Sequence, residues 1–280
     1  MIERTVVGWD GSSGADRALD WALARPSTEK LVVVHVDNDV ALQETFAANS
    51  PAAAARITLM EKADALRSAN PDRTIHTELV QGEIATALAA FSSPSTVVAV
   101  GTRHSTERRT RRSWSVGARV AGAAEGPVAV IPRAPHSEGR SIVVGVDDPE
   151  EAALLFAAEE AMRTGQTLRP VRAWQAGHHE VTETAPDAAY VESLATMYRN
   201  LVSDALDSIL DRYPDLIIEP VIRQGDAAAV LLDVAKGATM LVVGNRGFRG
   251  VKRFFLGSVS QAVVLSADIP TVVVSGGATT

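Results

Sequence analysis

The chain has 280 residues, of which 46% are hydrophobic and 22% charged, and its formal net charge is −7. This composition is that of an ordinary globular protein, and the length suggests about two domains. The absence of cysteine excludes disulfides, zinc–thiolate sites and thiol catalysis. The negative charge argues against non-specific nucleic-acid binding, which depends on attraction to phosphates.

The start of the chain carries no recognisable targeting signal. Residues 1–4 lead directly into an apolar run, without the basic start and small-residue cleavage site of a secretory signal. No apolar run approaches the roughly 20 residues that a membrane-spanning helix needs. We therefore expect a soluble, cytoplasmic protein that binds neither membranes nor nucleic acid.

Four short segments of the first half recur in the same order in the second half. They are VVGWD at 6–10 and VVGVD at 143–147, VQGE at 80–83 and RQGD at 223–226, VVAVG at 97–101 and MLVVG at 240–244, and GPVAV at 126–130 and IPTVV at 269–273. The offset is 137 residues for the first pair and 143 for the other three. A constant offset after one small insertion, here between the second and third strands, indicates a duplication. We predict domains at 1–133 and 140–280, joined by a polar, proline-containing linker.

Within the second copy, short apolar runs alternate with amphipathic segments. The expected strands lie at about 141–147, 168–174, 217–223, 239–244 and 270–274, and the expected helices at Glu150–Arg163, Asp187–Arg212, Ala227–Lys236 and Ser258–Ser266. Strands that are apolar throughout and alternate with helices predict a parallel sheet covered on both faces. The predicted fold class is therefore α/β, in two tandem doubly wound domains.

A glycine-rich loop follows the fourth strand of the second copy. From Gly244 the sequence has the spacing Gly-x2-Gly-x9-Gly-Ser, completed by Gly247, Gly257 and Ser258. Glycines let a backbone turn and approach a ligand without a Cβ in the way. A helix that begins near Ser258 presents free N–H groups to an anion, and the Ser258 hydroxyl either caps that helix or donates to a phosphate oxygen. The loop predicts a phosphate site, although such a loop alone is often only a turn.

Asp147 ends the first strand of the same copy. In a doubly wound sheet, strands one and four flank the crevice where ligands bind. We therefore expect Asp147 and Gly244 to face one pocket, in which the carboxylate holds a ribose hydroxyl or a Mg²⁺ ion. The alternative is that Asp147 caps the following helix, as Asp10 would in the first copy.

The Gly-x2-Gly-x9-Gly-Ser spacing, with VVGVD opening the domain, resembles the universal stress protein family in its tandem two-domain form, and the resemblance covers nearly the whole chain. It implies an adenine nucleotide α-hydrolase-like fold, with a five-stranded parallel sheet of order 3-2-1-4-5 in each domain. It also implies that the second domain binds ATP with Mg²⁺, and that Asp147 is the metal ligand. The implied cofactor-binding residues are Val146, Asp147, Ala173, Gly244, Arg246, Gly247, Gly257, Ser258, Val259 and Ser260. Val146 and Ala173 would lie near the adenine, and Arg246 is the first of four basic residues in the loop, at least one of which would screen phosphate charge.

Both copies depart from this pattern. Aligning Gly101 with Gly244 places His104 and Trp114 at the second and third glycines, although Ser115 aligns with Ser258. These side chains stand where the backbone must close on phosphate, so we expect the first copy to bind nucleotide weakly or not at all. Its secondary candidates are Asp10, Gly101 and Ser115. In the second copy, Asp148-Pro149 replaces Gly11-Ser12 of the first, and the extra carboxylate would either help to place a metal or repel phosphates.

Three further features have open interpretations. Trp174 closes the second strand of the second copy, and is either a core residue or a border of the adenine pocket. The arginines between 103 and 112 indicate a solvated surface loop, with an anion or partner contact as the alternative. The histidines show no convincing metal-binding spacing.

The chain contains neither the P-loop pattern G-x4-G-K-[ST] nor the G-x-S-x-G turn of serine hydrolases. We therefore expect a binding module with at most weak ATP hydrolysis, acting in stress adaptation or signalling through unidentified protein partners. The alternatives are a protein-interaction module of the same fold that binds no nucleotide, and a slow ATPase. The apolar last strands, near 128–131 and 271–275, are expected at sheet edges, where they would pair the two copies as an internal dimer. A homodimer of two chains is an additional option.

Overall fold

The computed structural model of the protein describes residues 2–26, 28–38, 51–102, 115–133, 139–147, 152–175, 188–245 and 256–275. The chain divides into two compact units, the first built mainly on residues 1–134 and the second mainly on residues 135–276. We call these units the first and second domains.

Strands and helices alternate along the described part of the first domain. In chain order they are β1 (Arg4–Gly8), α1 (Ser13–Leu23), β2 (Lys30–Asp37), α2 (Pro51–Ala69), β3 (Ile75–Gln81), α3 (Ile84–Ala89), β4 (Thr96–Gly101), α4 (Val116–Ala123) and β5 (Val128–Ile131). The strand order within this domain is β3-β2-β1-β4-β5, and its neighbouring strands pair in parallel. This order confirms the predicted doubly wound fold.

The second domain repeats this arrangement. Its elements are β6 (Ser141–Gly145), α5 (Ala152–Thr164), β7 (Thr167–Trp174), α6 (Ala188–Arg212), β8 (Val221–Gln224), α7 (Ala227–Val234), β9 (Met240–Asn245), α8 (Ser258–Ser266) and β10 (Thr271–Ser275). The strand order is β10-β9-β6-β7-β8, which is again 5-4-1-2-3. The pairs of β6 with β7, β6 with β9 and β7 with β8 are parallel.

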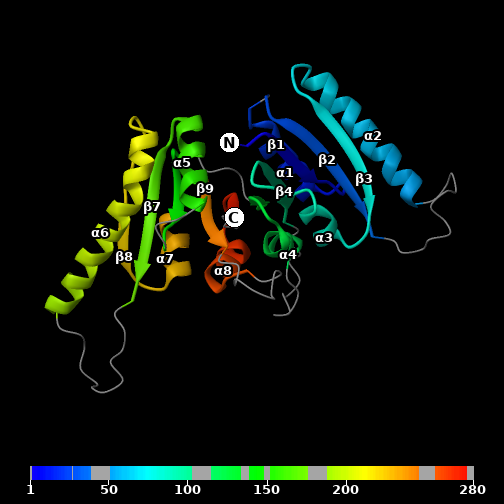
Figure 1. Cartoon of the computed structure of the whole chain (residues 1–280). Helices are drawn as coiled ribbons and strands as arrows, with labels where there is room; N and C mark the ends of the chain where they lie inside the picture. Colours follow the sequence, from blue (N-terminus) through cyan, green and yellow to red (C-terminus); the bar gives the residue numbers. More distant parts are fainter. Residues whose placement is uncertain are drawn as a thin grey trace. The chain divides into compact units, whose positions relative to one another are not determined.

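The central strands are buried on both faces because helices cover both sides of each sheet. Val6 and Val7 on β1 and Val143 and Val144 on β6 have no exposed surface. Figure 1 shows α2 running beside β3 in the first domain and α6 beside β7 and β8 in the second. Strands that are apolar on both faces are what a helix-covered parallel sheet requires.

One strand begins later than its predicted position. The prediction placed a strand at about 217–223, whereas β8 comprises Val221–Gln224. Pro220 has no backbone N–H to donate, so the ladder is interrupted before β8. Upstream of Pro220, Ile218 forms only an isolated parallel bridge with Leu168. The other predicted elements of the second domain agree with the structure to within two residues at each end.

β5 and β10 each end the strand order of their own domain, as predicted. The expected packing of the two copies through these strands stays a prediction. None of the helices among the described residues combines the length and apolar character that a membrane span requires.

Candidate functional site

A cavity of about 270 Å³ opens at the carboxyl ends of β1 and β4 in the first domain. Its wall is apolar and includes Val34, Val36, Leu88 and Val100. Its rim is polar and is formed by Asp10, Ser12, Thr102 and Ser115. This is the crevice at which doubly wound sheets bind their ligands.

The polar rim is held by helix capping. Ser12 is the N-cap of α1, and its hydroxyl oxygen accepts the N–H of Ala15 at 3.2 Å. The carboxylate of Asp10 accepts the N–H of Ser12 at 3.0 Å, so Asp10 shapes the turn before the helix. The alternative that Asp10 itself caps α1 is therefore wrong, because Ser12 holds that position. Ser115 caps α4 by accepting the N–H of Ala118 at 3.1 Å.

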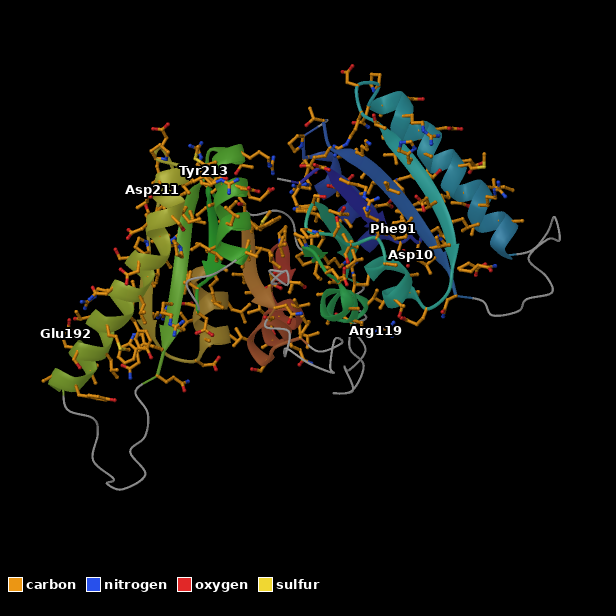
Figure 2. The ribbon with its side chains drawn as sticks, in the orientation of Figure 1. Asp10, Phe91, Arg119, Glu192, Asp211 and Tyr213 are labelled. Atoms are coloured by element: carbon orange, nitrogen blue, oxygen red, sulfur yellow. The ribbon has the colours of Figure 1, made fainter. Side chains whose placement is uncertain are left out.

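An ion pair joins the N-cap of α3 to α4, two helices whose residues line this cavity. Glu83 is the N-cap of α3, and its carboxylate also pairs with Arg119 on α4, which Figure 2 labels together with Asp10. Burial alone would raise the pKa of Glu83, but hydrogen bonds from the backbone of Ala85 and Thr86 and the charge of Arg119 lower it. The cap fixes the start of α3, which carries the cavity-lining side chains of Ile84 and Leu88.

Gly101 is explained by packing. A Cβ at this position would lie 2.0 Å from the backbone carbonyl oxygen of Gly14 on α1. No real Cβ contact is that short, so the close approach of β4 and α1 requires glycine at this position whether or not a ligand binds. The predicted secondary role of Gly101 in phosphate binding stays a prediction.

Gly244 is the aligned glycine of the second domain, and its surroundings differ. It is exposed at the carboxyl end of β9, and an added Cβ would meet only the Cβ of Ala153, at 3.9 Å. That distance is an ordinary van der Waals contact. Packing among the described residues therefore does not require glycine at position 244.

The start of α8 lies next to this strand end. Ser258 is exposed, Gly257 and Val259 are half-buried, and Ser260 is 4% exposed. The Ser260 hydroxyl donates to the carbonyl oxygen of Gly244 at 2.7 Å. This hydrogen bond ties the first turn of α8 to the end of β9, and it uses the proton that Ser260 would otherwise offer to a phosphate.

Asp147 is paired with an arginine that the sequence analysis did not single out. Nη1 of Arg172, on β7, donates to the Val146 carbonyl oxygen at 3.2 Å, and it also bonds the Asp147 carbonyl oxygen and carboxylate. The guanidinium lies 5.0 Å from the centroid of the Tyr198 ring. The Tyr198 ring in turn stacks on Trp174, with centroids 5.8 Å apart. Two arginines, Arg169 and Arg172, interrupt the apolar run 167–174, and this sequence signal does not distinguish between them.

The two residues predicted near the adenine lie beside this group. Val146 is 6% exposed, and its N–H donates to the Val171 carbonyl oxygen at 2.9 Å. Ala173 is half-buried and stands in register with Arg223 of β8. Trp174 is 6% exposed and stacked, which favours the core interpretation of this residue.

The remaining predicted positions lie outside the described residues. These are Arg246 and Gly247 of the glycine-rich loop, His104 and Trp114 of the first-domain loop with its arginines, and Asp148 and Pro149. Within the ranges that the structure describes, no three His, Cys, Asp or Glu side chains gather as metal ligands would.

Comparison with known proteins finds one family in both halves of the chain. The model of the universal stress protein family matches residues 1–132 and again residues 139–275. A universal stress protein of Mycobacterium tuberculosis is 29% identical over 300 residues, which cover 96% of this chain and 93% of that protein. A universal stress protein of Mycolicibacterium smegmatis is 28% identical over 290 residues, which cover 96% of this chain and 96% of that protein. The crystal structure of a universal stress protein from Archaeoglobus fulgidus shares the fold with a TM-score of 0.69, at 17% identity over 98% of this chain and 97% of that one.

Proposed function

This chain belongs to the universal stress protein family, and from that premise we propose that its second domain binds ATP and acts as a nucleotide-dependent stress or signalling module. The observation that carries the proposal is the open strand end at Gly244 beside the exposed start of α8. The spacing Gly-x2-Gly-x9-Gly-Ser joins these two features in the sequence.

The chemistry of this arrangement suits a phosphate chain. The first N–H groups of α8 have no acceptor within the helix, and the helix dipole adds partial positive charge there. The Ser260 hydrogen bond to Gly244 holds that helix start against the strand end. The exposed hydroxyl of Ser258 adds one more donor beside the same strand. Anions bind at helix starts of this kind.

The described residues do not offer a ready site for the expected Mg²⁺. Asp147, the proposed metal ligand, is already paired with Arg172, and no group of three His, Cys, Asp or Glu side chains that could hold a metal lies within the described ranges. Mg²⁺ is usually held by one or two carboxylates together with the phosphates of its nucleotide. We therefore assign no step to a protein-held metal, and we expect at most weak ATP hydrolysis.

Isothermal titration of the nucleotide-stripped protein with ATP tests this function. We expect one site per chain in the wild type and none in Gly257→Trp, which gives the second domain the residue that the first has at position 114. The matched control is the reciprocal Trp114→Gly, which leaves the second-domain site untouched and retains at least one site. Absence of binding in the wild type would contradict the proposal and favour a protein-interaction module of the same fold.

The first-domain cavity favours a second candidate function, the binding of a ligand smaller than ATP. Its volume of about 270 Å³ is just below the ~300–1,000 Å³ of sites for drug-sized molecules. The apolar wall and polar rim suit an adenosine-sized molecule without a phosphate chain. Adenosine binding that is lost in Ile84→Trp, which fills the cavity from α3, would support this site. Unchanged adenosine binding in that variant would exclude it.

A further inference from the structure

We propose that Arg172 takes the place of a divalent cation at Asp147, so that the second domain binds ATP without magnesium. This inference rests on the proposed function of that domain. The residues concerned lie at the carboxyl ends of β6 and β7, outside the glycine-rich loop.

Arg172 is fixed in position from several sides. Its Nη1 donates to the Val146 carbonyl oxygen at 3.2 Å and bonds both the carbonyl oxygen and the carboxylate of Asp147. Its guanidinium packs against the Tyr198 ring at 5.0 Å, and its side chain is only 16% exposed. Guanidinium groups are always charged in proteins and pair well with carboxylates. Asp147 therefore has a permanent counter-charge within its own domain.

The charges of the crevice require such a partner. The Asp147 carboxylate is 57% exposed at the end of β6, where a nucleotide would approach. A bare carboxylate would repel a polyphosphate, and the repulsion grows as solvent is excluded. Magnesium commonly removes it by bridging the two groups. Here the guanidinium already neutralises the carboxylate, and a cation that binds the carboxylate would have to compete with this ion pair.

Arg172 retains donors for a ligand. A guanidinium carries five N–H groups in a planar fork. The hydrogen bonds that it makes to the described residues all come from Nη1. Its Nε is buried and does not face a ligand, so the donors that remain for one are those of Nη2. Ribose and phosphate oxygens are acceptors that arginine binds well.

The first domain provides an internal contrast. The residue aligned with Arg172 is His35, because β1 pairs with β2 and β6 with β7 in the same register. A ring nitrogen of His35 lies 3.0 Å from the Trp9 carbonyl oxygen, the counterpart of the Val146 carbonyl. Asp10, the counterpart of Asp147, accepts the backbone N–H of Ser12. A histidine is not a permanent cation. The permanent cation therefore occurs only in the copy that keeps the intact glycine loop, at this aligned position.

The test is ATP affinity, measured by isothermal titration in EDTA and in Mg²⁺. For the wild type we expect affinities in the two buffers that agree within about threefold, which is under 1 kcal/mol. Arg172→Gln is expected to lose about tenfold or more in EDTA, because a charge-assisted contact is removed and Asp147 loses the positive charge of Arg172. Mg²⁺ should restore most of that loss, since it then has access to the carboxylate. Arg169→Gln, on the same strand but facing Glu219 at 3.9 Å, is the matched control and should behave as the wild type.

Two outcomes overturn the inference: wild-type binding that requires Mg²⁺, or Arg172→Gln binding that is unchanged in EDTA. The double variant Asp147→Asn/Arg172→Gln gives a further check, because removing the Asp147 charge as well should restore part of the binding in EDTA. If Arg172→Gln fails to fold, the wild-type comparison of the two buffers still decides. If the wild type binds ATP in neither buffer, the proposed function itself is refuted. If it binds ATP only in Mg²⁺, the proposed function stands and only the inference about Arg172 is refuted.

Discussion

The two domains share one fold, but the crevices at their strand ends are built differently. In the first, close packing against Gly14 requires glycine at position 101. In the second, the aligned Gly244 has room for a Cβ. In the second, Asp147 is paired with Arg172, whereas the first has His35 at the position aligned with Arg172. The comparison teaches that aligned glycines can be required for different reasons in the two copies. Only the surrounding structure separates a packing glycine from one that is free to serve a ligand.

The largest effect is expected from alanine at the two aligned glycines. Gly101→Ala should destabilise the protein by about 1–3 kcal/mol, because its Cβ would overlap a backbone oxygen that moves only with α1. Gly244→Ala should change stability by no more than about 0.5 kcal/mol, while weakening ATP binding. Urea unfolding of both variants measures the difference. Equal destabilisation would show that packing requires both glycines.

A smaller effect is expected at Ser260. Ser260→Ala removes the hydroxyl that donates to the Gly244 carbonyl oxygen in a buried position, at a cost of about 1 kcal/mol. The first domain has Gly117 at the aligned position and therefore lacks this hydrogen bond. Ser258→Ala, on the exposed side of the same turn, is the control and should leave the unfolding midpoint unchanged. If both variants unfold alike, the hydrogen bond does not hold α8.

The smallest effect is expected at Asp16, which only the first domain has. Burial would raise its pKa, but hydrogen bonds from Lys62 and Trp9 lower it. A pKa that folding lowers gives stability that is present above the unfolded value and lost as the pH falls through the folded value. Lys62→Met should therefore raise the Asp16 pKa in an NMR titration. The variant should lower the free energy of unfolding by less than about 1 kcal/mol near pH 7, since the pair is partly exposed. This difference in stability should vanish in acid, where Asp16 is protonated. A pKa that does not move would show that Lys62 leaves the carboxylate unaffected.

The fold could be predicted from the sequence because its signals are local and repeated. Apolar runs and the duplicated segments predicted the strands, and the strand order followed from the family resemblance. The error at β8 arose because apolar residues 216–218 extend the pattern past Pro220, which cannot donate to the ladder.

The site was harder to predict because it depends on neighbours that are distant in sequence. The pairing of Asp147 with Arg172 joins residues on two strands, and nothing in the spacing indicates that the arginine turns toward Val146. The packing role of Gly101 depends on where α1 passes. The apolar cavity wall was missed for the same reason, because Val36 and Leu88 look like ordinary core residues in sequence.

Photo-crosslinking with 8-azido-ATP, followed by peptide mapping, tests the central claim most directly. The account predicts that labelled peptides come from the second domain, near the ends of β6 and β9, and that unlabelled ATP competes for the label. Labelling confined to the first-domain crevice would contradict it, because the domain with the intact glycine loop would then not be the one that holds ATP.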